Sequence, residues 1–222
     1  MKALLAHDPE LVVLTEFHPV RSAAVVEGLG EAGFAHLTHS EAGYGYQVLL
    51  ASKLPLSGRL ALDPTSYPVG GYVQATITGM DIVVAGVYVP VISAVPLKEK
   101  RRFWAMLHER AAQNRDHPYL VIGDWNTGDF PLDKESASRP FSCTREYRRM
   151  ADLGFDEAWR SLNPTSREFT WWSNQGTGFR IDHAFVSPAL RSRLLNARYS
   201  HREREARVSD HSVMVVDLAA AA

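Results

Sequence analysis

The stretch Tyr119-Leu120-Val121-Ile122-Gly123-Asp124-Trp125-Asn126 reads as a buried strand that ends in a carboxylate and an amide. Because alternate residues of a strand point to the same side, Asp124 and Asn126 should project together beyond the strand end, where Gly123 permits a tight turn. A carboxylate beside an amide can orient a water molecule and bond a phosphate oxygen, although the same two residues also suit a simple Asx-turn. The segment 127–140 that follows has no periodicity and predicts an exposed loop beside the site.

Apolar runs of strand length recur along the whole chain. They are 11–14, 47–51, 72–77, 82–89, 119–122, 169–172, 181–186 and 213–218. Helical spacing is confined to 97–114, to 24–32 before Gly33 and to 147–153 before Gly154. The turn Thr78-Gly79-Met80-Asp81 between two of the runs predicts a hairpin. Since strands outnumber helices, we expect two largely antiparallel sheets packed face to face, with helices outside.

The composition indicates one domain, 1–222, with 219–222 as a frayed tail. The chain has 222 residues, 45% of them hydrophobic, which is enough for a single sizeable core. Lys plus Arg number 24 against 25 for Asp plus Glu, so the chain lacks the excess of basic residues found in proteins that bind long duplexes. Any nucleic-acid binding should therefore be weak or local.

The single cysteine, Cys143, excludes an intrachain disulfide and reads as a lone semi-buried thiol. We expect a cytoplasmic protein without membrane insertion, because neither a signal peptide nor a run of spanning length is present.

An acid and a histidine from distant segments form a second candidate pair. Asp182 alternates into the apolar run 181–186, where burial of a carboxylate is expensive unless it is paired. His211, in Ser209-Asp210-His211, is the obvious partner, because a carboxylate fixes the imidazole tautomer and favours its charged form. Asp210 would then be free to face a metal ion or its waters. The alternative is a purely structural histidine.

Four further residues have both a functional and an ordinary interpretation. Glu16 directly follows the apolar run 11–14 and Thr15, so it is either a solvated strand end or a ligand for a hard cation such as Mg²⁺. Tyr88 could donate to a phosphate or pack on the rim. Of the adjacent Trp171 and Trp172, one should face the core, while the outward one either stacks on a base or sugar or makes a second packing contact. The remaining histidines lack ligand spacing and read as surface or packing residues.

The motifs in chain order resemble those of the endonuclease/exonuclease/phosphatase superfamily. They are Leu14-Thr15-Glu16, Val87-Tyr88-Val89-Pro90, Gly123-Asp124-Trp125-Asn126, Arg180-Ile181-Asp182-His183 and Ser209-Asp210-His211. Together with the fourth motif, Thr170-Trp171-Trp172-Ser173 is most similar to the exonuclease III and abasic-site endonuclease branch. The resemblance implies an α/β four-layered sandwich of two mostly antiparallel sheets flanked by helices. It also implies an Mg²⁺- or Mn²⁺-dependent phosphodiesterase, with DNA as the favoured partner and substrate.

The resemblance also assigns roles, which here stay expectations. Glu16 and Asp210 would serve the metal, and Asp124 would activate or orient the attacking water. Asn126 and Tyr88 would hold the phosphate, while Asp182 would orient His211. The expected substrate contacts are Trp171, Trp172 and Arg180.

One departure from the family pattern concerns the beginning of the chain. Family members start with a strand that contains an asparagine and is followed by a helix, and here Met1–His7 already reads as the end of that helix. We therefore expect one sheet to lack a central strand. Two alternatives to a DNA nuclease remain open. One is a phosphodiesterase or phosphatase acting on a phospholipid, a sugar phosphate or another small ester, and the other is a non-catalytic binding module that retains the fold.

Overall fold

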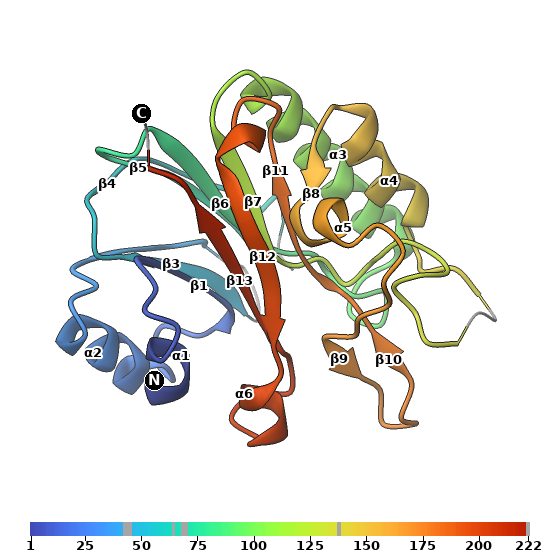
Figure 1. Cartoon of the computed structure of the whole chain (residues 1–222), viewed down its shortest axis with the longest axis horizontal. Helices are drawn as coiled ribbons and strands as arrows, with labels where there is room; N and C mark the ends of the chain where they lie inside the picture. Colours follow the sequence, from blue (N-terminus) through green and yellow to red (C-terminus); the bar gives the residue numbers. More distant parts are fainter. Residues whose placement is uncertain (42–45, 64, 68–70, 137–138, 221–222) are drawn as a thin grey trace.

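A six-stranded sheet forms the centre of the molecule (Figure 1). The computed structural model describes residues 1–41, 46–63, 65–67, 71–136 and 139–220. The strands, in sheet order, are β4 (Leu56–Ala61), β5 (Gly71–Ile77), β6 (Ile82–Tyr88), β7 (Tyr119–Asp124), β11 (Asp182–Val186) and β8 (Asp156–Glu157). Every neighbouring pair is antiparallel except β6 and β7, which are parallel because helix α3 (Leu97–Asn114) connects them.

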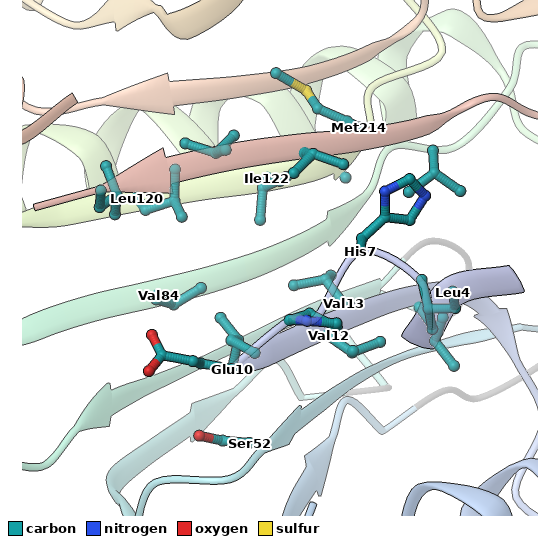
Figure 2. A pocket seen from close by; sticks show the side chains of 18 of the residues that line it. Leu4, His7, Glu10, Val12, Val13, Ser52, Val84, Leu120, Ile122 and Met214 are labelled. Carbon is teal, nitrogen blue, oxygen red and sulfur yellow. The ribbon is translucent and has the colours of Figure 1, made fainter. Parts of the chain in front are cut away.

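The second β-layer is divided into two separate small sheets. One has the order β1-β3-β2, and the other pairs β12 with β13. Their bounds are β1 (Leu11–Phe17), β2 (His36–His39), β3 (Gln47–Ser52), β12 (Leu194–Ser200) and β13 (Val213–Leu218). Among the described residues, no strand pairs with the outer side of β1 or of β13. An open groove separates these two edges (Figure 2).

Helices cover the outer face of the six-stranded sheet and that of the β1-β3-β2 sheet, which confirms the predicted sandwich of sheets flanked by helices. Helices α1 (Lys2–Leu5) and α2 (Ala23–Glu31) pack on β1 and β3, whereas α3 and α4 (Thr144–Asp152) pack on the six-stranded sheet. The remaining elements are α5 (Ala158–Leu162), the hairpin β9 (Trp171–Trp172) and β10 (Gly178–Phe179), the 3₁₀ turn Arg191–Arg193, and α6 (Arg202–Glu205). No helix in the described ranges is both long and apolar enough to cross a membrane.

The observed elements differ from the predicted ones mainly at exposed positions. The turn 78–81 joins β5 to β6 as expected, with Ile77 facing Ile82 across the ladder. The predicted strand 169–172 shortens to Trp171–Trp172. Strands β2, β4 and β12 were not predicted, because their residues are mostly exposed or half-buried and carry no apolar alternation.

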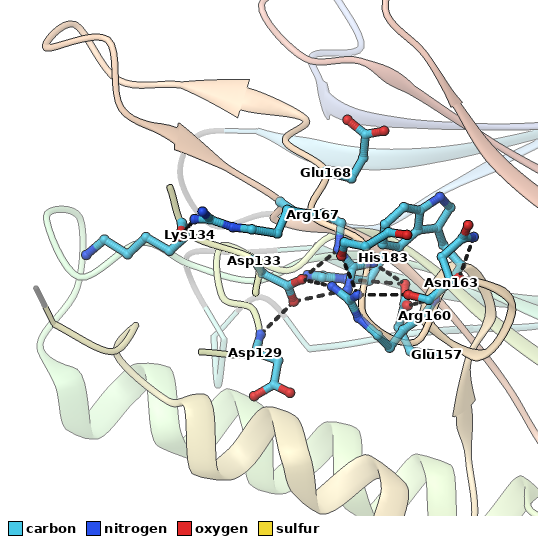
Figure 3. Close-up of polar contacts among 12 residues, drawn as sticks. Asp129, Asp133, Lys134, Glu157, Arg160, Asn163, Arg167, Glu168 and His183 are labelled. Atoms are coloured by element: carbon cyan, nitrogen blue, oxygen red, sulfur yellow. Dashed lines mark hydrogen bonds and ion pairs between the residues drawn. The ribbon is translucent and has the colours of Figure 1, made fainter. Parts of the chain in front are cut away.

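A buried ionic cluster joins three segments beneath the site (Figure 3). Arg180 donates from Nε and Nη2 to the two carboxylate oxygens of Asp133, at 2.8 and 3.0 Å, and from Nη1 to Oε1 of Glu157 at 2.8 Å. Arg160 adds a further bond of 2.6 Å to Oδ1 of Asp133. Because each carboxylate is bonded to a guanidinium, the cluster ties the segment after β7 to β8 and to the start of β11.

Two expectations are corrected by this cluster. Arg180 was expected to contact the substrate, but its side chain is 0% exposed and engaged by Asp133 and Glu157, so its role is structural. The segment 127–140 was expected to be an exposed loop, yet Thr127 and Asp133 within it are completely buried. An arginine next to a catalytic motif is ambiguous in sequence, because a buried carboxylate partner attracts it as well as a phosphate does. Residues 137–138 of that segment lie outside the described part of the chain.

Replacing Arg180 with Met should destabilise the fold strongly. The change leaves the carboxylates of Asp133 and Glu157 buried without the positive charge of the Arg180 guanidinium. Removing one partner of a buried ion pair typically costs about 3–5 kcal/mol. The midpoint of urea unfolding measures the loss. Arg198→Met is the matched control, because its ion pair with Asp217 is nearly half exposed on both sides and should contribute less than about 1 kcal/mol. Equal losses in the two variants would contradict the role given to the cluster.

The same cluster predicts an acid-sensitive stability. Burial by itself would raise the pKa of Glu157, but the charge of Arg180 and the contact with His183 lower it to about 2. A carboxyl whose folded-state pKa lies below its unfolded value stabilises the fold above the unfolded pKa and loses that contribution as the pH falls through the folded value. The free energy of unfolding of the protein should therefore fall between about pH 4.5 and pH 2. In Glu157→Gln, urea titrations should show a smaller fall over this range.

Candidate active site

Three adjacent strands of the central sheet end at the same level, and each places a polar residue there. The register pairs Tyr88 of β6 with Asp124 of β7, and Asp124 with Asp182 of β11. The site residues of three motifs thus form one row across the sheet, although they are far apart in the sequence. The register of this sheet therefore assembles the site.

Asp124 and Asn126 are locked to each other by a tight turn. The backbone N–H of Asn126 donates to Oδ1 of Asp124 at 2.8 Å, and its side-chain Nδ2 donates to Oδ2 at 2.9 Å and to the carbonyl of Val89 at 2.9 Å. The Asx-turn and the site are therefore the same structure. Since both side-chain protons of Asn126 are used within the protein, Asn126 orients the carboxylate of Asp124 and offers a phosphate no free N–H in this arrangement.

Gly123 is required by the close approach of β6. Its φ is +150°, and a Cβ at this position would lie 2.0 Å from the carbonyl oxygen of Val87. No other residue can bring β7 this close to its neighbour while ending the strand at Asp124. The glycine therefore holds Asp124 at the floor of the site.

Asp124 lies in a concentration of negative charge. Its side chain is buried, and burial together with the charges of Asp182 and Glu16 raises its pKa to about 8, against the opposing effect of His211. Three carboxylates that share one small region favour either protonation or a bound cation. The electrostatics of the site therefore suit a positively charged species among these acids.

His211 is held in its charged form by Asp182. Its Nδ1 lies 2.9 and 3.1 Å from the two carboxylate oxygens of Asp182. Burial would lower the pKa of His211, but the carboxylate of Asp182 raises it to about 9. Because Asp182 engages Nδ1, the other ring nitrogen, Nε2, is directed elsewhere and is bonded by no residue in the described ranges. This geometry suits a proton donor aimed at an anionic group.

Glu16 reaches the row of strand ends from the other layer. A bulge between Leu14 and Phe17 gives Glu16 a φ of +55°, and its Oε1 accepts a hydrogen bond of 3.1 Å from the hydroxyl of Tyr88. Burial and the neighbouring charges of Glu16 and Asp124 raise the pKa of Tyr88, so the phenol stays neutral and remains a donor. A strained backbone at a polar residue is typical of functional positions.

The donor set at this place fits a hard cation with few protein ligands. No group of three His, Cys, Asp or Glu residues in the described ranges is arranged to hold a metal ion by itself. A single Mg²⁺ ordinarily takes one or two carboxylates and completes its shell with waters and phosphate oxygens. Glu16 is exposed and bonded by the hydroxyl of Tyr88, and Asp210 is exposed beside His211, where its charge contributes to the raised pKa of that histidine.

The two tryptophans face in different directions, as adjacent strand residues do. The ring of Trp171 lies 6.4 Å from that of His211 and 5.7 Å from that of Phe179, which places it at the wall of the site. The ring of Trp172 stacks under the guanidinium of Arg204, whose central carbon lies 3.8 Å from the ring centroid. Trp171 is therefore the better placed of the two to contact a ligand of His211.

Lys100 belongs to the site and was missed. It is 1% exposed, and its Nζ donates to the backbone carbonyl of Asn126 at 2.7 Å. Burial lowers the pKa of Lys100 to about 8. The signal was present in the sequence, because Lys100 precedes Phe103 by three residues and Leu107 by seven, and so lies on the apolar face of its helix. It secures the turn that carries Asp124.

His183, which follows Asp182, is a packing residue, as predicted for the histidines outside the motif pair. It is completely buried, and its Nε2 lies 2.9 Å from the carbonyl oxygen of Thr127. Its other nitrogen faces Tyr147 and Glu157 at 3.4 Å each. His183 thus links the active-site turn to the buried ionic cluster.

Solved structures with the same architecture have low sequence identity to the chain. A variant of the 3′ phosphatase NExo from Neisseria, bound to a product DNA hairpin, superposes with a TM-score of 0.83 at 22% identity, over 98% of this chain and 92% of that one. An AP endonuclease from Archaeoglobus fulgidus gives a TM-score of 0.82 at 21% identity, over 98% of this chain and 91% of that one. These likenesses establish the fold.

Sequence comparison adds a relative and a family. Exodeoxyribonuclease III of Haemophilus influenzae is 31% identical over 123 residues, a match that spans 46% of this chain and less than half, 45%, of that protein. The pattern of the Endonuclease/Exonuclease/phosphatase family matches residues 1–211, which include every motif of the site. The chain belongs to the endonuclease/exonuclease/phosphatase family.

Proposed function

We propose that this protein is a divalent-metal-dependent nuclease that hydrolyses phosphodiester bonds of DNA in the cytoplasm, in the manner of exonuclease III and AP endonucleases. The observation that carries the proposal is the cross-strand pairing of Asp124 with Asp182, which brings the Asp124–Asn126 turn beside the Asp182–His211 pair. Family membership supports hydrolysis of a phosphate ester, and the relatives named exodeoxyribonuclease III and AP endonuclease favour DNA.

Each residue of the site has a separate role in the proposed reaction. Asp124, with its raised pKa and its fixed orientation, is the group that would orient the attacking water and accept its proton. His211, as an imidazolium, and Tyr88, as a neutral phenol, would donate hydrogen bonds to the phosphate oxygens as negative charge develops on them. An Mg²⁺ or Mn²⁺ ion held by Glu16, with Asp210 assisting, would neutralise charge on the phosphate when bound.

Substrate binding is proposed to be local. The formal charge of the chain is -1, so the chain has no excess of positive charge with which to bind many phosphates along a duplex. Trp171 beside His211 offers a ring on which a base or a sugar can stack next to the cleaved bond. Affinity should therefore depend on the few nucleotides around the site, and only moderately on salt.

Removing the imidazole of His211 should abolish most of the activity. His211→Ala should lower the rate of cleavage of abasic duplex DNA by roughly two to four orders of magnitude, because one positioned acid contributes on that scale. The assay is cleavage of an end-labelled oligonucleotide in Mg²⁺. His117→Ala is the matched control, since His117 is exposed and lies outside the site. A His211→Ala enzyme as active as the control would refute the assignment.

Removal of divalent metal should stop turnover. Treatment with EDTA should abolish cleavage, and addition of Mg²⁺ or Mn²⁺ should restore it, because His211 opposes only part of the negative charge of Glu16, Asp124 and Asp182 and the phosphate adds more. Glu16→Gln should raise the metal concentration needed for half-maximal rate by at least about tenfold, since it removes the ligand charge assigned to the ion. Unchanged metal dependence in that variant would show that the ion is held elsewhere.

A substrate panel separates DNA from the alternatives within the family. Abasic duplex DNA, single-stranded DNA, RNA, sphingomyelin and bis-p-nitrophenyl phosphate are compared at equal enzyme concentration with each metal. We expect the DNA substrates to be cleaved fastest, and stacking on Trp171 should make Trp171→Ala lose about 1–3 kcal/mol of DNA binding. Preferential hydrolysis of sphingomyelin or of the small diester would move the proposal to another branch of the family.

A further inference from the structure

A network of hydrogen bonds joins the backbone next to His211 to the backbone of Asp182. Its centre is Thr170, which is completely buried and directly precedes β9. The carbonyl of Thr170 accepts the backbone N–H of Ser212 at 2.8 Å. The hydroxyl oxygen of Thr170 accepts the backbone N–H of Asp182 at 3.4 Å. One buried residue therefore holds both the segment that carries His211 and the acid that pairs with it.

The imidazole of His201 extends this network through two further contacts. Its Nδ1 lies 2.7 Å from Oγ of Ser212, and its Nε2 lies 3.2 Å from Oε1 of Glu168. An ionised carboxylate only accepts hydrogen bonds, so Nε2 carries a proton, and Nδ1 of a neutral imidazole accepts from the Ser212 hydroxyl. His201 thus connects the residue that follows His211 to the segment that precedes β9.

His201 belongs to a segment that is docked on the hairpin β9–β10. It is the N-cap of α6, and its carbonyl accepts the backbone N–H of Glu205 at 2.9 Å. In the same helix, the guanidinium of Arg204 lies over the ring of Trp172 of β9. Because α6 is fixed to the hairpin in this way, the imidazole of His201 projects from a defined position.

We propose that His201 is a positioning residue for His211. By joining Ser212 to Glu168, it holds the loop before β13 against the segment before β9. Asp182 orients the imidazole of His211 through Nδ1, and His201 fixes the backbone that carries this imidazole. The inference rests on the proposed function and deepens it, because it gives His201 control over where Nε2 of His211 points and no contact with the substrate.

The exposure of the contacts separates a positioning role from a purely structural one. The side chains of His201 and Glu168 are 31% and 29% exposed, so water screens their ion pair and the pair adds little to the stability of the fold. The pair nevertheless fixes the residue next to the proposed proton donor. Since a displacement of about 1 Å at a reacting group can cost about a hundredfold in rate, removal of His201 should affect turnover more than folding.

The test compares His201→Ala with His108→Ala. His108 also joins two segments, because its Nε2 lies 2.8 Å from the carbonyl oxygen of Glu146, but its bond leads to α4 and not to the site. In His201→Ala, kcat for cleavage of abasic duplex DNA should fall by about 10- to 100-fold, as is usual when a supporting partner is lost. KM should change by less than about threefold, because the substrate contacts remain.

The control variant should show the opposite pattern. His108 is buried, so His108→Ala should lower the midpoint of urea unfolding more than His201→Ala does, and it should leave kcat within about twofold of the unsubstituted protein. His201→Gln is the conservative variant, since its amide offers a donor to Glu168 and an acceptor to Ser212. It should restore kcat to within about threefold.

Amide hydrogen exchange, followed by NMR, gives a readout that does not depend on catalysis. The N–H of Ser212 is bonded to the carbonyl of Thr170, so its exchange rate reports whether the loop is held. In His201→Ala, exchange at Ser212 should become faster by about tenfold or more, and in His108→Ala it should stay unchanged. The amides of β7, which is paired on both sides, serve as the internal reference.

The outcomes separate this inference from the proposed function. Faster exchange at Ser212 together with a lower kcat in His201→Ala, and neither change in His108→Ala, supports the inference. Unchanged kcat in a folded His201→Ala variant, a lower kcat with unchanged exchange at Ser212, or equal losses of kcat in both variants overturns it. If the unsubstituted protein cleaves no DNA with either metal, the proposed function is refuted. In that case, faster exchange in His201→Ala still upholds the contact that holds the loop, and unchanged exchange overturns it.

Discussion

The antiparallel pairing of β7 with β11 is the constraint on which the site depends. It places Asp124 opposite Asp182, and through Asp182 it positions His211, which lies in the loop two residues before β13. A slip of one residue in this register would turn Asp182 to the opposite face and bury it among apolar side chains. Gly123 secures the register because it lets β7 approach β6 closely. The apolar residues of β7 and β11 also secure it, because only one register directs them all into the core.

The molecule handles buried charge in two opposite ways within a short distance. In the cluster of Arg180, Asp133 and Glu157, each carboxylate is bonded to a guanidinium, and the pKa of Glu157 falls to about 2. At the site, Asp124 is buried near further acids and its pKa rises to about 8. The paired charges of the cluster form a rigid support beneath the site. The carboxylates crowded around Asp124 instead favour binding of a cation or a proton. His183 connects the two through its contacts with Glu157 and the backbone of Thr127.

Much of the fold and of the site was predictable because the residue pattern of each short segment indicates its secondary structure. The eight apolar runs all contain strands, the hairpin 78–81 forms, and the four-layered architecture follows from the excess of strands and the three amphipathic helices. The Asp182–His211 pair was predictable from chemistry, because a carboxylate inside an apolar strand requires a partner. Strand β12 was not predictable, since it is exposed along most of its length and its pairing with β13 supplies the order that its own residues lack.

The sequence by itself determined which residue types lie at the strand ends, and therefore the class of chemistry and the family. Only the tertiary structure decided which of them face one another, because side-chain partners depend on register and packing across segments far apart in the chain. It turned Arg180 from a substrate contact into the centre of a buried ionic cluster, and it added Lys100 as the support of the Asp124 turn. It turned Asn126 from a phosphate donor into the clamp on Asp124.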